Sequence, residues 1–161
     1  MASTPSLVPH RFVELVGEVT GRIGSQPLQP DLSDLLSIEF PADGPWFAEM
    51  EKLCEQGCAE GWLCAREAGG IKFGRPVKPG AATHGFSVDV VEMNDVVGPH
   101  HRHPHGEVDL VMPRDPGAAF DGVHKGWKVY AADSAHRPTV AGGKALVLYL
   151  LPNGAIEFSG S

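Results

Sequence analysis

The chain has 161 residues, 42% of them hydrophobic, and 13 Lys and Arg against 20 Asp and Glu give it a net charge of −7. This length fits one domain with a core of its own, and the negative charge argues against a nucleic-acid partner. No basic segment precedes an apolar run at the N-terminus and no run of 18 apolar residues occurs, so we expect a cytoplasmic protein without a membrane partner.

The first third of the chain is predicted to be helical after a loose tail over residues 1–9. Apolar residues recur at helical spacing over 10–23, and a short helix is expected over 31–38. A further helix is expected over 44–56, with Pro45 in its first turn and Gly57 at its end. Cys54 in this segment and Cys58 and Cys64 after it are interpreted as buried, reduced thiols of a cytoplasmic protein.

From residue 61 onward the pattern changes to short β-strands. The 20 Gly and 14 Pro indicate many turns, and Pro152-Asn153-Gly154 predicts a hairpin. We therefore predict a mainly β protein, an antiparallel barrel (61–161) on which the N-terminal tail and helices (1–60) pack as one folded unit. The expected strands are Ile71–Val77, Thr83–Met93, Glu107–Met112, Trp127–Tyr130, Arg137–Val140, Ala145–Leu150 and Ala155–Phe158.

Four of the eight histidines fall within six residues, at positions 100, 101, 103 and 105. In an extended strand, residues 101, 103, 105 and 107 share one face, although Pro104 and Gly106 interrupt such a strand. Three imidazoles and the carboxylate of Glu107 on one face indicate a divalent cation site. The alternatives are a solvated histidine-rich loop and an incidental surface tract.

The spacing His101-x-His103-x-x-x-Glu107, followed by an apolar strand, resembles the first metal motif of the cupin superfamily. The segment 126–138 resembles the second cupin motif, with His136 in the ligand position. The resemblance implies a jelly-roll barrel and a metal site made of His101, His103, Glu107 and His136. The chain departs from the pattern outside the ligands, at Ala131 and Asp133 and through a displaced glycine, Gly98.

A closer resemblance runs over about residues 45–158. The segments 61–70, 86–93, 98–113, 136–140 and 142–158 resemble the small one-domain family that contains 4-hydroxylaminobenzoate lyase. That family acts in bacterial nitroaromatic degradation. The resemblance implies conversion of 4-hydroxylaminobenzoate to 3,4-dihydroxybenzoate, or protocatechuate, with release of ammonia.

The ligand set suits one divalent cation per chain. Four ligands leave two positions of an octahedral ion open, which favours Mn²⁺ or Fe²⁺, with Zn²⁺, Co²⁺ and Ni²⁺ as alternatives. We expect Lewis-acid catalysis without redox turnover, and this chemistry needs a proton carrier. His105 is the first candidate and His100 the second, the alternative being outer-shell hydrogen bonding or plain exposure.

A benzoate substrate also needs a partner for its carboxylate and a pocket for its ring. Arg66 and Arg75 are the favoured carboxylate partners, because a guanidinium pairs bidentately with carboxylate, although either could be an ordinary surface arginine. Trp127 and Tyr149 are candidates for an aromatic pocket, with plain core packing as the alternative. The three histidines without a pattern are expected to be structural: His10, His84 and His124.

Two other functions use the same ligands. One is an Fe(II)- and O2-dependent cupin dioxygenase on a small aromatic substrate, and the other is a cupin that binds a metal or small ligand without turnover. Turnover without oxygen separates the lyase from the dioxygenase. An exposed barrel edge favours a homodimer.

Overall fold

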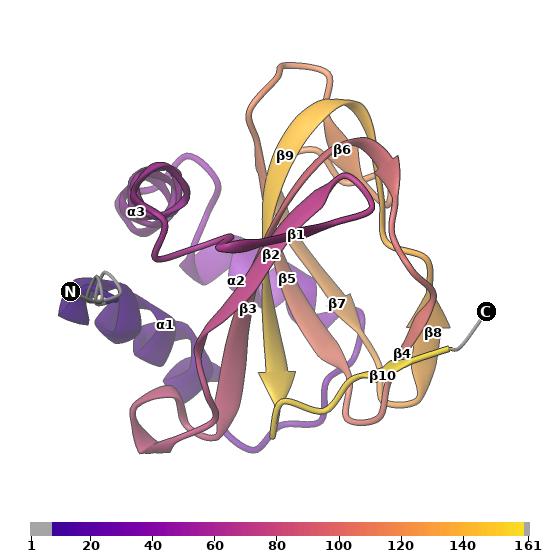
Figure 1. The fold of residues 1–161 in the computed structure, drawn as a ribbon. Helices are drawn as coiled ribbons and strands as arrows, with labels where there is room; N and C mark the ends of the chain where they lie inside the picture. Colours follow the sequence, from indigo (N-terminus) through magenta and orange to yellow (C-terminus); the bar gives the residue numbers. More distant parts are fainter. Residues whose placement is uncertain (1–7, 160–161) are drawn as a thin grey trace, which may run out of the picture.

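The computed structural model describes residues 8–159 and has three layers (Figure 1). Helices α1 (His10–Ile23), α2 (Leu32–Glu39) and α3 (Pro45–Glu60) cover one face of a large antiparallel sheet. A smaller sheet lies on the opposite side. Most of the tail expected over 1–9 falls outside the described residues.

The large sheet has seven strands in the order β1-β2-β3-β9-β5-β7, with β6 paired to β9. The small sheet has the order β10-β4-β8, and every strand pair in both sheets is antiparallel. The large sheet comprises β1 (Arg66–Ala68), β2 (Ile71–Val77), β3 (Phe86–Val97), β5 (Glu107–Pro113), β6 (Ala119–Phe120), β7 (Gly126–Tyr130) and β9 (Thr139–Pro152). The small sheet comprises β4 (His101–His103), β8 (Ser134–His136) and β10 (Glu157–Phe158).

The alternation of side chains along the long strands divides the core in two. On β9, Leu146, Leu148 and Leu150 face the helices, whereas Val147 and Tyr149 face the small sheet. Strands β3 and β5 alternate in the same way, because successive side chains of a strand point to opposite faces. The large sheet is therefore buried on both faces, which makes its central strands almost continuously apolar.

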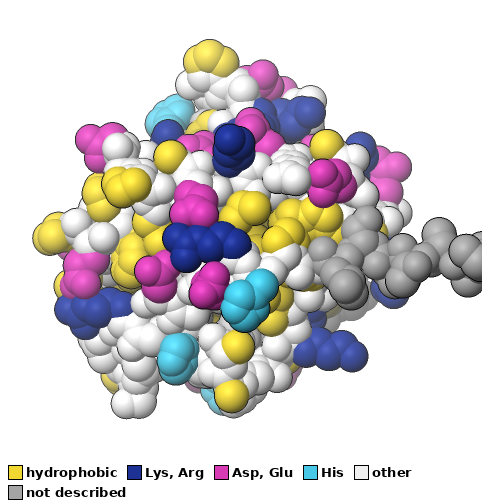
Figure 2. Space-filling view, turned by 90° about the vertical axis from the view of Figure 1, so that its left-hand side faces the viewer, with side chains coloured by type: hydrophobic (Ala, Val, Ile, Leu, Met, Phe, Trp, Pro, Cys, Tyr) yellow, Lys and Arg dark blue, Asp and Glu magenta, His cyan; other side chains and the backbone are white. Residues whose placement is uncertain are grey.

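The helical layer is held by an apolar stripe and by ion pairs at its surface. Helix α1 has the predicted bounds and buries Phe12, Leu15, Val16, Val19 and Ile23. On the outer face of the helices, acidic and basic side chains alternate with apolar ones (Figure 2). The surface ion pairs include Arg11 with Glu49 and Arg22 with Glu39, both at 2.7 Å. Within residues 8–159, no helix is long and apolar enough to cross a membrane.

The end of α3 differs from the prediction. The helix passes through Gly57 and ends at Glu60, and Gly61 takes the left-handed conformation that terminates it, with φ of 87°. The N–H groups of Gly61 and Leu63 both donate to the Gly57 carbonyl, so the chain folds back against the last turn of the helix. Gly57 is needed for packing, because a Cβ there would lie 2.5 Å from the Leu63 side chain.

Some expected strands are also placed differently. The turn at Asn153-Gly154 forms, but it does not make a hairpin, because β9 belongs to the large sheet and β10 pairs with β4 in the small one. Of the expected run over 137–140, only Thr139 and Val140 lie in a strand, at the start of β9. In the run over 83–93, Thr83 ends a short 3-10 helix (81–83) and the strand itself starts at Phe86. The barrel is a jelly-roll sandwich of two hydrogen-bonded sheets rather than one closed sheet.

Gly57→Ala should destabilise the protein even though Ala is the better helix former. The added methyl group would overlap Leu63, and overpacking of this kind costs about 1–3 kcal/mol, against a propensity gain of about 1 kcal/mol. Urea unfolding should show a net loss of up to about 2 kcal/mol in the free energy of unfolding. Ala59→Gly is the comparison at an exposed position of the same helix, where the loss of helix propensity alone should lower stability. An increase in stability from Gly57→Ala would contradict the packing argument.

Candidate metal centre

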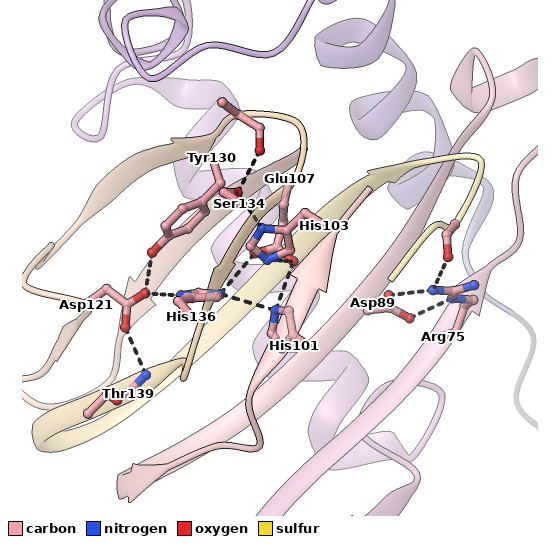
Figure 3. Close-up of polar contacts among 12 residues, drawn as sticks. Arg75, Asp89, His101, His103, Glu107, Asp121, Tyr130, Ser134, His136 and Thr139 are labelled. Atoms are coloured by element: carbon pink, nitrogen blue, oxygen red, sulfur yellow. Dashed lines mark hydrogen bonds and ion pairs between the residues drawn. The ribbon is translucent and has the colours of Figure 1, made fainter. Parts of the chain in front are cut away.

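Four side chains from both sheets converge between the layers (Figure 3). Strands β4 and β8 pair so that His101 lies opposite His136 and His103 lies opposite Ser134. Glu107, the first residue of β5, reaches the same point from the large sheet. One ligand atom from each of His101, His103, Glu107 and His136 lies within 4.8 Å of the others.

A tight turn between β4 and β5 allows this convergence. β4 ends at His103, and the chain reverses through Pro104 and His105 before β5 begins. Gly106 in this turn has a φ of 88°, and a Cβ there would lie 2.7 Å from the Tyr130 carbonyl oxygen. The shared face predicted from strand alternation therefore holds for residues 101 and 103, whereas His105 is turned out to solvent.

Three of the convergent polar atoms are buried and without hydrogen-bond partners in the described structure. His103 Nε2 and both carboxylate oxygens of Glu107 are of this kind, and the side chains of His101, His103 and Glu107 are 2%, 0% and 0% exposed. Unpaired buried polar atoms cost about 1–3 kcal/mol each, and more for a charged group. A cation bound between them would remove this cost.

The distances also fit a single ion. His101 Nε2 lies 3.2 Å from His136 Nε2, and His103 Nε2 lies 3.4 Å from Glu107 Oε1. Two ligands with bonds of about 2.1 Å to one ion, at octahedral or tetrahedral angles, lie about 3.0–3.4 Å apart. Nitrogen and carboxylate ligands of this kind fit the borderline divalent cations expected from the sequence.

The outer nitrogen atoms of two histidines are held by groups that orient the rings. Ser134 donates its hydroxyl hydrogen to the Ala131 carbonyl at 2.6 Å, so it accepts from His103 Nδ1 at 2.9 Å. Asp121 accepts from His136 Nδ1 at 2.6 Å. Both rings are thereby protonated on Nδ1, which leaves the Nε2 lone pair free to bind a metal.

Asp121 is the most connected of these outer groups. The oxygen that accepts from His136 also accepts from the Tyr130 hydroxyl, and the other oxygen accepts from the Thr139 N–H at 2.9 Å (Figure 3). Burial raises the pKa of Asp121, but the hydrogen bonds from His136, Tyr130 and Thr139 outweigh it, so the pKa lies below its usual value. The carboxylate stays charged and can stabilise positive charge on His136.

The electrostatics inside the centre favour a neutral imidazole. Burial lowers the pKa of His103 to about 4, against the opposing effect of the Glu107 charge. Asp109 lies behind Glu107 on β5, and burial together with the Glu107 charge raises its pKa well above the usual value. At neutral pH, His103 is therefore unprotonated, and the surroundings of Asp109 favour its neutral form.

Sequence reasoning did not single out Asp121, Ser134 or Tyr130. Asp121 precedes His136 by 15 positions and belongs to no recognisable spacing. Ser134 could have been found from the register of β4 on β8, since it lies two residues before His136 and therefore opposite His103. Strand order and register, rather than local sequence, select these residues.

A cavity of about 680 Å³ opens beside the centre and reaches His101. Its lining is mostly apolar and includes Tyr149 and Phe158, and both expected carboxylate partners, Arg66 and Arg75, lie on its wall. Arg75 is already engaged, because Asp89 accepts from it at 2.8 and 3.0 Å (Figure 3). Arg66 makes no ion pair or side-chain hydrogen bond within the described part of the chain.

Trp127 does not belong to this cavity. It lies on the opposite face of the large sheet, where its indole N–H donates to the Phe40 carbonyl at 2.9 Å and its ring packs against Trp46 and Phe47. Along β7, Trp127 and Val129 point to the helices while Tyr130 points to the small sheet. The expectation of a pocket wall is therefore wrong for Trp127, whereas Tyr149 does line the cavity.

The two histidines expected to carry protons are not in the cluster. His105 is exposed in the turn between β4 and β5. His100 is half-buried beside the end of β10, and its Nδ1 shares a hydrogen bond of 2.6 Å with Ser159 Oγ. Of the remaining histidines, His84 Nδ1 lies 2.9 Å from the Thr20 hydroxyl and His124 Nδ1 lies 3.1 Å from the Ala118 carbonyl.

Fold and site together define a small jelly-roll protein of the cupin type with a buried cluster of potential metal ligands. An RmlC-like cupin protein from Ralstonia eutropha JMP134 superposes with a TM-score of 0.44 and 14% identity, over 60% of this chain and 64% of that chain, less than two thirds of its length. The pattern of the family described as PnbB, 4-hydroxylaminobenzoate lyase, matches residues 14–158. The chain therefore belongs to this family, and the resemblance noted from the sequence is confirmed.

Two relatives named 4-hydroxylaminobenzoate lyase match almost end to end. The protein from Nocardioides sp. (strain LMS-CY) is 29% identical, and the alignment covers 97% of this chain and 95% of the relative. The protein from Pseudomonas putida is 27% identical, with 90% and 94% covered. The similarity thus spans the helical layer as well as both sheets.

Asp121→Asn should weaken metal binding while leaving the four ligands in place. Loss of such an outer-shell partner typically costs about 10–100-fold in metal affinity. Chelator-competition titration of the purified protein measures this change. Asp133→Asn is the matched control, because Asp133 is 76% exposed and pairs with Arg102 at the surface, so equal affinities for the two variants would contradict a role for Asp121.

Metal affinity should fall as the solution becomes acidic. A ligating imidazole must be neutral, so protons compete with the metal increasingly below a pH of about 6. Metal content after equilibration across pH 5 to 8, with a folding check by circular dichroism at each pH, tests this expectation. A flat curve would show that the histidines are not the ligands.

Proposed function

We propose that this chain is a metal-dependent lyase that converts 4-hydroxylaminobenzoate and one water into 3,4-dihydroxybenzoate and ammonia. The observation that carries the proposal is the buried cluster of three histidines and one glutamate at the end of an apolar cavity. The substrate is supported by family membership and by the two relatives that bear this enzyme's name.

His101, His103, Glu107 and His136 would hold one divalent cation. The reaction balances with water alone and requires no external oxidant or reductant. The proposed mechanism therefore needs no change in the oxidation state of the ion. When bound, it would supply Lewis acidity that weakens the N–O bond of the hydroxylamine. The ligand set favours Mn²⁺ or Fe²⁺, with Zn²⁺, Co²⁺ and Ni²⁺ as alternatives.

Arg66 is the proposed partner of the substrate carboxylate. It lies on the wall of the cavity and is not engaged by an acidic side chain within residues 8–159, whereas the Arg75 guanidinium is already occupied by Asp89. A charge-assisted pair with Arg66 would orient the ring along the cavity, with the hydroxylamino group toward His101. Tyr149 would pack beside the ring, since it lines the same cavity and its ring centroid lies 6.5 Å from that of His101.

The proton carriers remain the two histidines outside the ligand set. We place His100 ahead of His105, because His100 adjoins the end of β10 beside the cavity whereas His105 is exposed in the turn. General acid-base catalysis contributes about 10²–10⁴-fold in rate. We therefore expect His100→Gln to lower kcat by this factor without changing the amount of bound metal. The same loss in His105→Gln instead would identify His105 as the carrier.

The deciding experiment is an assay of 4-hydroxylaminobenzoate under strict anaerobiosis, with ammonia and 3,4-dihydroxybenzoate both quantified. We expect equal amounts of the two products and the same rate with and without oxygen, since water supplies the new oxygen atom. An absolute need for oxygen would identify the Fe(II)-dependent dioxygenase instead. Metal binding without turnover of this substrate would indicate a non-catalytic binding protein.

Arg66→Gln should raise KM by about 10–100-fold with little change in kcat, as expected when a charge-assisted pair that binds substrate and transition state equally is lost. Steady-state kinetics with 4-hydroxylaminobenzoate measure this split. Arg137→Gln is the matched control, because Arg137 is exposed next to His136 and does not line the cavity. Equal KM values for both variants would show that Arg66 does not bind the substrate carboxylate.

A further inference from the structure

Two of the three cysteines are in contact at the end of α3. The Sγ atoms of Cys58 and Cys64 lie 2.9 Å apart and share a hydrogen bond. The contact is created by the turn in which Gly61 ends the helix and Leu63 folds back onto Gly57. Cys64 follows in the left-handed region, with φ of 52°, a conformation that costs a non-glycine residue about 1–3 kcal/mol and is concentrated at functional sites.

The three thiols have different environments. Cys54 is fully buried, with its Sγ 3.8 Å from Met50 Sδ, and burial raises its pKa. The hydrogen bond with Cys64 lowers the pKa of Cys58, against the opposing effect of partial burial. The same hydrogen bond and burial raise the pKa of Cys64. Cys58 is therefore the thiol that ionises first, and the thiolate is the nucleophilic form.

The pair is better suited to redox chemistry than to metal binding. Within residues 8–159, His101, His103, Glu107 and His136 form the one group of three or more potential ligands, so no third ligand joins the two sulfurs. A disulfide has an S–S bond of about 2.05 Å, so the two Sγ atoms need to approach by only about 0.9 Å from their distance of 2.9 Å.

The surroundings also allow a small oxidant to reach the pair. Cys58 and Cys64 are both partly exposed, and Cys64 lies on the wall of the cavity that ends at His101. Its neighbours Trp62, Ala65 and Arg66 line the same cavity. A covalent bond to Cys58 would tether this wall to the last turn of α3.

We propose that Cys58 and Cys64 form a redox-active dithiol that hydrogen peroxide converts to an intramolecular disulfide. The Cys58 sulfur attacks the peroxide, so that an S–O bond forms, the O–O bond breaks and one water leaves after protonation. The Cys64 sulfur then attacks Cys58, forming the S–S bond and releasing the sulfenic oxygen as a second water. The two thiols lose two electrons and two protons, and one hydrogen peroxide is reduced to two waters.

The dithiol is independent of the proposed lyase reaction, because neither cysteine belongs to the metal cluster and the test does not use activity. The purified full chain is treated with hydrogen peroxide, alkylated under denaturing conditions and cleaved after glutamate. Cleavage at Glu55, Glu60 and Glu67 places Cys54, Cys58 and Cys64 in three different peptides. We expect peptides 56–60 and 61–67 to become cross-linked and to separate again with dithiothreitol, while Cys54 remains a free thiol.

Rates of alkylation in the native protein give a second measurement that needs no mutation. Cys58 should react with iodoacetamide at least about 10-fold faster than Cys54, because only the thiolate reacts. Equal rates, or peroxide oxidation of Cys58 to sulfinic acid without a cross-link to Cys64, would overturn the proposal.

Single serine variants separate the roles of the two sulfurs. In Cys64→Ser, the oxidised Cys58 should persist as a sulfenic acid that dimedone traps, whereas Cys58→Ser should yield neither product. Cys54→Ser is the matched control and should form the 58–64 disulfide as the wild type does. Failure of this control to form the disulfide, or a cross-link between two chains instead of within one, would disprove the assignment.

Discussion

The structure depends on one buried carboxylate. Glu107 is fully inaccessible to solvent, and neither of its oxygens has a hydrogen-bond donor among the described residues. Removing an ionised carboxylate from water costs several kcal/mol, which a protein recovers only through a close counter-charge. Three imidazole nitrogens surround Glu107 at 3.4–3.9 Å, and a neutral imidazole supplies no counter-charge. The cluster is therefore complementary to a cation, and both sheets contribute side chains to it.

The rest of the fold serves to hold these ligand atoms in place. The register of β4 on β8 sets His101 against His136, and the large sheet supplies Glu107 from the far side. Asp121 and Ser134 then select the protonated nitrogen of two rings, so that the lone pairs point inward. Each of these contacts joins segments that are distant in sequence, and the long strand β9, paired with both β3 and β5, keeps the large sheet rigid beneath them.

The cavity beside this cluster carries on its wall two side chains with proposed roles, Arg66 and Cys64. It is mostly apolar, which suits an aromatic ring, and Arg66 is the guanidinium on its wall that an acidic side chain does not already occupy. The same wall carries Cys64, which contacts Cys58 through the turn at the end of α3. The proposed substrate contact and the proposed dithiol thus lie on one short segment, residues 61–66, whose course is set by the close packing of Leu63 on Gly57.

The sequence alone was sufficient for the elements that local patterns specify. The apolar stripe of α1 and the alternating strands follow from side-chain periodicity, and the spacing of His101, His103 and Glu107 follows from strand alternation interrupted by one turn. His136 was found through its resemblance to the second cupin motif. These features were accessible because each lies within one continuous segment.

Tertiary structure alone decided the features that depend on how segments pair. Asn153-Gly154 forms a turn whether or not the strands on either side of it pair with each other. Only the sheet order shows that β10 does not pair with β9 but with β4. Trp127 was expected in the pocket and lies on the helix side, because strand alternation tells which residues share a face but not which face meets the metal centre. Asp121 approaches His136, and Asp89 occupies Arg75, through folding of segments with no shared motif. The amino-acid sequence determined which four side chains could ligate a metal, and the packing of two sheets determined which side chains surround them.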